Sequence, residues 1–244
     1  MDLERARAWI EQARSVAVLT GAGVSAESGV PTFRGPGGVW RTYRAEDLAT
    51  PQGFARDPRL VWEWYDWRRQ VIAKVEPNPA HRALAELERR KPSFTLITQN
   101  VDGLHDRAGS LRILKLHGDI WQLRCTVCRH EWRDARVPLG ELPPLCACGA
   151  MARPGVVWFG ESLPAGVLEQ AERAVREAEV VLVAGTSAVV YPAAGLIPFA
   201  RHSGAKVIEV NLEATPFSSQ VDCSLAGKAG EILPKLLAAP SPSA

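Results

Sequence analysis

The sequence predicts an α/β fold, a doubly wound parallel sheet that carries a smaller inserted module. Short apolar runs rich in β-branched residues end in small or polar residues and alternate with helical patterns, which is the order of elements in such sheets. A length of 244 residues allows one large domain with an insert and a sizeable core. The near balance of 29 Lys and Arg against 27 Asp and Glu disfavours a domain that binds a polyanion through its overall charge.

Five apolar runs are expected to be the core strands, namely residues 16–20, 94–98, 113–116, 180–184 and 207–210. The chain opens with both charge signs, which is typical of an amphipathic helix and not of an export signal. Further helical patterns cover residues 80–90 and 164–178. The uncharged segment 180–200 is long enough to span a bilayer, but its glycines and prolines favour a buried strand and a turn. We therefore expect a cytoplasmic protein without a membrane partner.

Two stretches break this alternation and are expected to form the smaller module, a Trp-rich segment over 31–75 and a cysteine segment over 121–154. The large sheet domain is then expected over 1–30, 76–120 and 155–238, with a disordered tail over 239–244.

Four of the five cysteines predict one structural zinc ion. Cys125-x-x-Cys128 and Cys146-x-Cys148 have the paired layout of tetrahedral sites, in which four thiolates leave no open position for catalysis. The alternative is four unconnected buried thiols, which the spacing disfavours. Cys223 stands alone and is expected to be an ordinary buried thiol.

Polar and glycine residues follow the predicted strands where ligands of open α/β sheets bind. They are Gly21, Gln99, Asn100, His117, Gly185, Thr186 and Asn211. The turn Gly21-Ala-Gly23-Val-Ser-Ala26 fits either a phosphate-binding turn or a plain tight turn. The irregular segment 28–38 that follows disfavours a simple hydride-transfer enzyme and favours a loop over a cofactor.

Two further patterns carry candidate chemistry. His117 ends a predicted strand and suits a general base, although a lone histidine more often has a structural role. Tyr65 and Arg68 share one helix face, where they either pack in an aromatic core or form a fork for a carboxylate.

Taken together, these segments resemble the sirtuins, which are NAD-dependent protein lysine deacylases with a Rossmann-like fold. The resemblance is carried by residues 21–35, 98–102, 116–119, 156–160, 185–187 and 211–213 and by the four cysteines. The loop form Ala-Glu-Ser-Gly-Val-Pro-Thr-Phe-Arg-Gly, together with Tyr65 and Arg68, resembles the subclass that removes acidic acyl groups, in a bacterial or archaeal form.

The resemblance implies that the strand ends and the first loop hold NAD. The implied residues are Gly21, Ala22, Gly23, Ala26, Glu27, Thr32, Phe33, Arg34, Trp40, Gln99, Asn100, Val101, Asp102, Gly185, Thr186, Ser187, Asn211, Leu212, Glu213 and Ala229. It also implies catalytic roles for His117, as general base, and for Asn100.

The implied substrate is an acylated lysine side chain of a protein. The backbone of Val156, Val157, Trp158 and Phe159 would pair with the peptide as an added strand. Tyr65 and Arg68 would bind the distal carboxylate of succinyl- or malonyl-lysine, with Ala49 leaving room in the acyl pocket.

The implied reaction transfers the acyl group to ADP-ribose and releases nicotinamide and O-acyl-ADP-ribose, and we expect a monomer to carry it out. Protein ADP-ribosylation is the alternative activity, since the same activated ribose could pass to a side chain. A zinc-ribbon module for nucleic acid is a third possibility, which the charge balance disfavours.

Overall fold

A parallel sheet of six strands forms the centre of the molecule in the computed structural model, which describes residues 2–32, 39–40 and 43–239. The strand order is β11-β10-β9-β1-β4-β5. The strands are β1 Ser15–Thr20, β4 Ser93–Thr98, β5 Ile113–Lys115, β9 Val180–Ala184, β10 Lys206–Asn211 and β11 Cys223–Ala226. The predicted α/β fold class is confirmed, and the five predicted strands are present; β11 is an additional edge strand.

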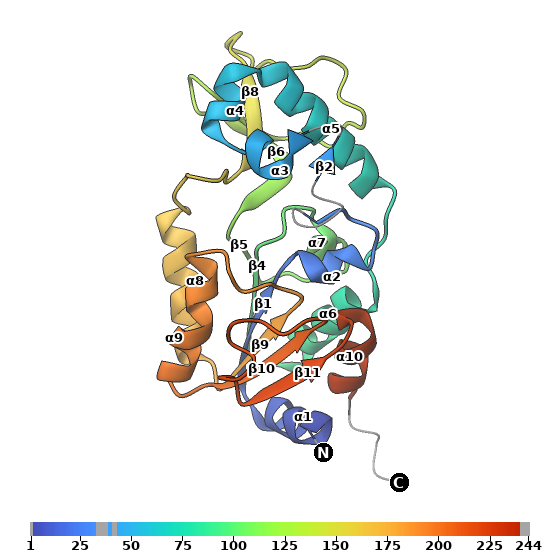
Figure 1. Ribbon diagram of the computed structural model, residues 1–244, viewed down its shortest axis with the longest axis vertical. Helices are drawn as coiled ribbons and strands as arrows, with labels where there is room; N and C mark the ends of the chain where they lie inside the picture. Colours follow the sequence, from blue (N-terminus) through green and yellow to red (C-terminus); the bar gives the residue numbers. More distant parts are fainter. Residues whose placement is uncertain (1, 33–38, 41–42, 240–244) are drawn as a thin grey trace.

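Helices cover both faces of this sheet because successive strand residues point to opposite sides. On one face Val16, Val18 and Leu96 pack against α1, α6 and α10. On the other face Ala17 and Leu19 pack against α8 and α9 (Figure 1). The helices are α1 Asp2–Gln12, α6 Pro79–Arg90, α8 Ala165–Glu177, α9 Leu196–His202, preceded by the 3-10 turn η2 Ala193–Gly195, and α10 Ala229–Leu236.

A smaller module lies beyond the carboxyl ends of the sheet strands (Figure 1). Its three-stranded antiparallel sheet has the order β7-β6-β8, with β6 Gly118–Cys125, β7 Glu131–Arg133 and β8 Ala152–Val156. The helices α3 Ala45–Leu48, α4 Pro51–Arg56 and α5 Pro58–Ala73 pack on it, and the strands β2 Val39–Trp40 and β3 Tyr43–Arg44 form a separate pair. One apolar core, with Trp62, Trp64 and Leu123, joins the Trp-rich and cysteine segments.

Arg69 ties α5 to the small sheet from inside. Its side chain is fully buried and donates to the backbone carbonyls of Ile120, Asp134 and Arg136. A guanidinium can satisfy several acceptors at once, which suits this buried junction.

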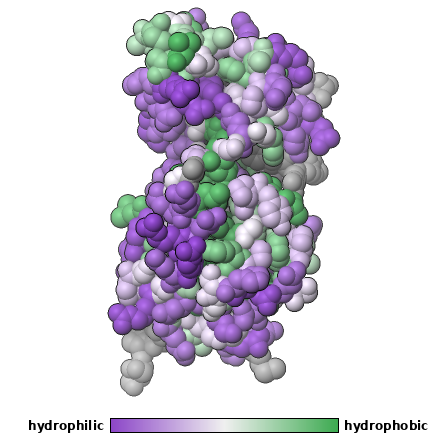
Figure 2. All heavy atoms as spheres, turned by 90° about the vertical axis from the view of Figure 1, so that its left-hand side faces the viewer, coloured by the Kyte–Doolittle hydropathy of each residue, from purple (hydrophilic) through white to green (hydrophobic). Residues whose placement is uncertain are grey.

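The surface narrows between the small module and the sheet domain, and apolar side chains are visible in the hollow (Figure 2). Two short helices reach this level from the sheet, α2 Ala22–Ala26 and α7 Leu104–Arg107. Within the part of the chain that the structure describes, no helix is long and apolar enough to cross a membrane. The exact domain limits stay a prediction, and residues 240–244 of the expected tail lie outside the described residues.

Candidate active site

The turns after β1 and β9 pack backbone against backbone. Gly21 N–H donates to the carbonyl of Ala184 at 3.1 Å, and Gly23 N–H donates to that of Gly185 at 2.8 Å. Gly185 has a φ of +57°, and a Cβ on Gly23 would lie 2.8 Å from the Gly185 oxygen. The contact therefore requires glycine on both sides, and it brings two predicted NAD-binding turns together.

Asn100 ties the end of β4 to the first of these turns. Its buried amide nitrogen donates to the Gly21 carbonyl at 3.0 Å and to the Ser25 hydroxyl at 3.1 Å. The neighbouring Gln99 donates from Nε2 to the hydroxyl of Thr186 at 3.1 Å. Side-chain amides thus join the carboxyl ends of β1, β4 and β9 at one place, which we call the crevice.

His117 lies at the same place, directly before β6. Its Nδ1 is 2.9 Å from the carbonyl oxygen of Gln99, which can only accept, so Nδ1 carries the proton in the neutral ring. The other nitrogen, Nε2, is then the basic one. Burial lowers the pKa of His117, against a smaller opposite effect of the bond to Gln99, so the neutral form predominates at pH 7.

Asp102 is buried beside this crevice. It accepts from the backbone N–H of Leu104 at 2.8 Å and from the hydroxyl of Ser25, while Arg68 lies within electrostatic reach. Burial nevertheless raises the pKa of Asp102, because desolvation outweighs these favourable contacts.

Tyr65 and Arg68 are both buried on α5, with 1% and 4% of their surfaces exposed. The Arg68 guanidinium donates to the carbonyl of Pro31 at 3.3 Å and lies 5.4 Å from the ring centre of Trp64. The hydroxyl of Tyr65 accepts from Nε1 of Trp158 at 3.0 Å. The aromatic-core description is therefore observed, with a phenol and a guanidinium inside the core that interact electrostatically, whereas the carboxylate fork stays a prediction.

The segment that follows β8 is bonded to His117, directly before β6, and to Ala49, directly after α3. Val157 N–H donates to the carbonyl of His117, Trp158 N–H to the carboxylate of Glu161, and Phe159 N–H to the carbonyl of Ala49, each at 2.9 Å. Because these three N–H groups are bonded inside the chain, a peptide strand added here can form hydrogen bonds with carbonyl oxygens of the segment but not with these amides.

A buried polar chain, which the sequence motifs do not predict, continues from the crevice into the sheet domain. The Ser25 hydroxyl lies 3.3 Å from Nε2 of His81, and the rings of His81 and His105 are 4.7 Å apart. His105 reaches Thr20 through Nε2 at 3.1 Å. One available signal was Asn78-Pro-Ala-His81, a capping box at the start of α6 that fixes the His81 ring.

The remaining predicted NAD residues differ in exposure, and some of them lie outside the described residues. Phe33 and Arg34 lie outside the described residues, and the side chain of Trp40 is not described. Glu27 accepts from the backbone N–H of Gly230 at 2.9 Å, next to Ala229, and so caps the start of α10. Those at the surface are Gly23, Ala26, Glu27, Ser187, Leu212 and Glu213; those partly or fully covered are Ala22, Thr32, Val101, Asn211 and Ala229.

The four predicted zinc ligands meet at the far end of the small module. The Sγ atoms of Cys125, Cys128, Cys146 and Cys148 all lie within 4.8 Å of one another. Two of the separations are 3.5 Å and 3.7 Å, close to the value of about 3.8 Å for a tetrahedron with Zn–S bonds of about 2.3 Å. The donor set fits structural zinc, and the predicted thiol cluster is confirmed.

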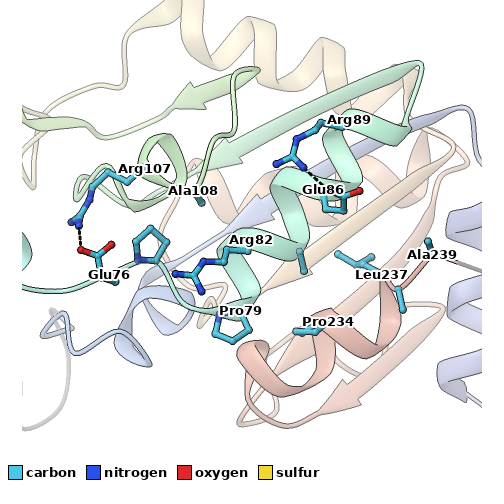
Figure 3. Close-up of a pocket in the computed structure, with 13 residues that line it drawn as sticks. Glu76, Pro79, Arg82, Glu86, Arg89, Arg107, Ala108, Pro234, Leu237 and Ala239 are labelled. Atoms are coloured by element: carbon cyan, nitrogen blue, oxygen red, sulfur yellow. Dashed lines mark hydrogen bonds and ion pairs between the residues drawn. The ribbon is translucent and has the colours of Figure 1, made fainter.

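A cavity of about 640 Å³ lies elsewhere, between α6, α7 and α10 (Figure 3). Arg107 and Arg89, which line it, pair with Glu76 and Glu86. None of the residues predicted to bind NAD or substrate lines this cavity. We therefore keep the crevice, and not this cavity, as the candidate active site.

Comparison with known proteins agrees with this architecture. A sequence profile of the Sir2 family matches residues 21–192. The chain is 54% identical to an NAD-dependent protein deacylase of Aquifex aeolicus over 91% of this chain and 93% of that one. It is 52% identical to an NAD-dependent protein deacylase of Thermus thermophilus over 98% and 95%.

Solved structures agree as well. A crystal structure of a Sir2 homologue in complex with NAD superposes with a TM-score of 0.92, at 50% identity and covering 96% of this chain and 92% of that one. A Sir2 complex with p53 peptide and NAD superposes with a TM-score of 0.88, at 32% identity and covering 97% and 98%. The resemblance drawn from the motifs is thus confirmed, and the chain belongs to the Sir2 family.

Proposed function

We propose that this chain is an NAD-dependent protein-lysine deacylase that removes acetyl groups and the acidic malonyl and succinyl groups. The acyl group passes to ADP-ribose, and nicotinamide and O-acyl-ADP-ribose are released. One observation carries the proposal: Gln99 bonds the candidate base His117 through its carbonyl and the β9 turn through its side chain. The base is thereby fixed to the turns that would hold NAD.

The packed glycine turns and the strand-end amides fit a dinucleotide. Gly21, Gly23 and Gly185 offer backbone without side chains, while Asn100 and Asp102 offer polar groups in a buried setting. NAD supplies a ribose carbon made electrophilic by its positively charged nicotinamide leaving group. The role of the crevice is to hold the weakly nucleophilic acyl amide in line and to exclude water.

His117 is suited to take a proton from a ribose hydroxyl. Its Nδ1–H is committed to Gln99, so Nε2 keeps its lone pair. Because burial lowers its pKa below 6.5, the ring is deprotonated at neutral pH and ready to act as base. We expect kcat/KM to be constant through pH 7 and to fall only below the ordinary histidine range.

Tyr65 and Arg68 would recognise the acyl end. A guanidinium and a phenol both donate hydrogen bonds, and a succinyl or malonyl carboxylate only accepts them. An acetyl group fits the same space without using these donors. Ala49 is buried in the same apolar core as Tyr65, and its small side chain would leave room for the acyl group.

We further propose that the protein acts as a monomer in the cytoplasm on acylated lysines of other proteins, with zinc holding the small module. None of the five cysteines is in a disulfide, and zinc requires its four cysteine ligands in reduced form, which supports a reducing compartment. No open zinc position is left for a reacting group, since four thiolates complete the site.

The deciding experiment is a panel of acetyl-, malonyl- and succinyl-lysine peptides with and without NAD. Nicotinamide and O-acyl-ADP-ribose should form in equal amounts, and none should form without NAD. Peptide deacylation without NAD consumption would contradict the proposal. ADP-ribose bound covalently to protein in amounts comparable to turnover would favour the ADP-ribosyltransferase activity instead.

His117→Tyr should abolish turnover of every acyl peptide while zinc stays bound. His202→Tyr is a matched control, because its Nδ1 also bonds a backbone carbonyl, that of Pro198 at 2.7 Å, but on an exposed helix away from the crevice. Turnover retained in His117→Tyr would remove it as the base.

A further inference from the structure

Trp158 and Tyr65 form a buried hydrogen bond where the proposed function places the acyl group. The indole Nε1–H donates to the Tyr65 hydroxyl oxygen at 3.0 Å, and the two side chains are 3% and 1% exposed. A phenol that accepts from an indole keeps its own proton for another acceptor. Burial also raises the pKa of Tyr65, so the hydroxyl remains a neutral donor at physiological pH.

Three contacts hold the indole in this orientation. The backbone N–H of Trp158 donates to the Glu161 carboxylate at 2.9 Å. The Arg153 guanidinium lies over the ring, 3.5 Å from its centre, and Phe54 packs at 5.2 Å. Arg153 is itself fixed by two bonds to the Glu161 carboxylate, of 2.6 Å and 2.8 Å. The ion pair therefore clamps both the backbone and the ring of Trp158.

We infer that Trp158 is a positioning residue for acidic acyl groups: clamped by Arg153 and Glu161, it orients the Tyr65 hydroxyl as a donor toward the acyl carboxylate. This inference rests on the acyl pocket of the proposed function. A carboxylate gains from a donor that is already oriented, because less conformational freedom is lost on binding. The methyl end of an acetyl group gains nothing from it.

Trp158→Phe tests this role, since it keeps an aromatic ring and removes the N–H. We expect the KM for a succinyl-lysine peptide to rise about fivefold to tenfold more than the KM for the acetyl peptide, the worth of one buried hydrogen bond. Trp62→Phe is the matched control. It removes another buried indole N–H, bonded to the Ala152 carbonyl at 2.8 Å, and should leave the ratio unchanged.

A double-mutant cycle with Tyr65→Phe separates positioning from packing. If Trp158 acts through the Tyr65 hydroxyl, Trp158→Phe should cause no further loss of selectivity in the Tyr65→Phe background. An equal loss in both backgrounds would overturn the inference, because the indole would then act by filling space.

Arg153→Met tests the clamp without altering the indole, and it decides the matter where Trp158→Phe does not fold. Selectivity should shift in the same direction, and an unchanged ratio would overturn the role of the ion pair. A wild-type protein that removes acetyl but not succinyl groups would refute the acyl preference in the proposed function. Wild-type desuccinylation with unaltered selectivity in Trp158→Phe would refute only this inference.

Discussion

Replacing Arg68 by Met should separate desuccinylation from deacetylation. The guanidinium is buried and keeps its charge although burial lowers its pKa, with Tyr65 and Asp102 as its electrostatic partners. A hydrogen bond to a charged group contributes about 1.5–3 kcal/mol, which corresponds to a loss of about 10- to 150-fold in kcat/KM for succinyl peptides.

The same change has a smaller cost that both substrates share. Arg68 also donates to the Pro31 carbonyl at 3.3 Å and offsets part of the rise that burial causes in the pKa of Asp102, so its removal disturbs the predicted NAD site. We expect this loss to stay within about fivefold for the acetyl peptide, the worth of one ordinary hydrogen bond.

The assay compares kcat/KM for succinyl- and acetyl-lysine peptides at saturating NAD. Arg59→Met is the control, because Arg59 lies on the same helix but is exposed, with a 3.3 Å ion pair to Glu63. Equal losses on the two peptides would refute a carboxylate-binding role for Arg68 and leave only its effect on the NAD site.

Three further outcomes are expected. Gly185→Ala should destabilise the fold by about 2 kcal/mol or more in urea unfolding and raise the KM for NAD, since its φ is +57° and the new Cβ would lie 2.4 Å from Val24 N. The control Gly166→Ala, with open space at the start of α8, should instead stabilise the fold by up to about 1 kcal/mol. Similar effects of the two substitutions would contradict the strain expected at Gly185. Cys146→Ser should lose zinc and the folded small module, whereas the control Cys223→Ser should keep one zinc per chain in a metal assay. Zinc retained by Cys146→Ser would exclude the four-thiolate site. Burial lowers the pKa of His81 to about 4 in the folded protein, against an ordinary value of 6.5, so the unfolded chain takes up its proton first as the pH falls. The free energy of unfolding should therefore fall by about 3 kcal/mol between pH 6.5 and 4, and His81→Asn should remove this loss. If the free energy of unfolding has the same pH dependence in both proteins, His81 does not titrate in this way.

The sequence predicted the sheet because each core strand is a continuous apolar run, and buried parallel strands require such runs. The strand β11 was missed because Cys223–Ala226 is short, lies at the sheet edge and alternates buried with exposed residues. The zinc cluster was predicted because its spacing is local: the two members of each pair are two or three residues apart.

Contacts between distant segments could not be predicted in this way. The bond from Trp158 to Tyr65 joins residues 93 positions apart, and that from Ser25 to His81 joins residues 56 apart. Helical spacing places Tyr65 on a face of α5, but only the packing of α5 on β8 shows that this face meets Trp158. For the same reason the sequence left the carboxylate fork and the aromatic core as alternatives; the structure shows the aromatic core, and the fork stays a prediction.

The position of β4 between β1 and β5 explains why so much chemistry gathers at one strand end. The two residues that follow β4 bond different segments: Gln99 bonds the β9 turn and His117, and Asn100 bonds the β1 turn. Two residues further on, the carbonyl of Asp102 accepts from the indole of Trp121 in the small module at 2.8 Å. Since one short stretch joins the predicted NAD turns, the base and the small module, a substitution in it should alter NAD binding and acyl transfer together. Tyr65 and Trp158 lie outside this stretch, on α5 and after β8. Substitutions of these two residues should therefore affect mainly the choice of acyl group.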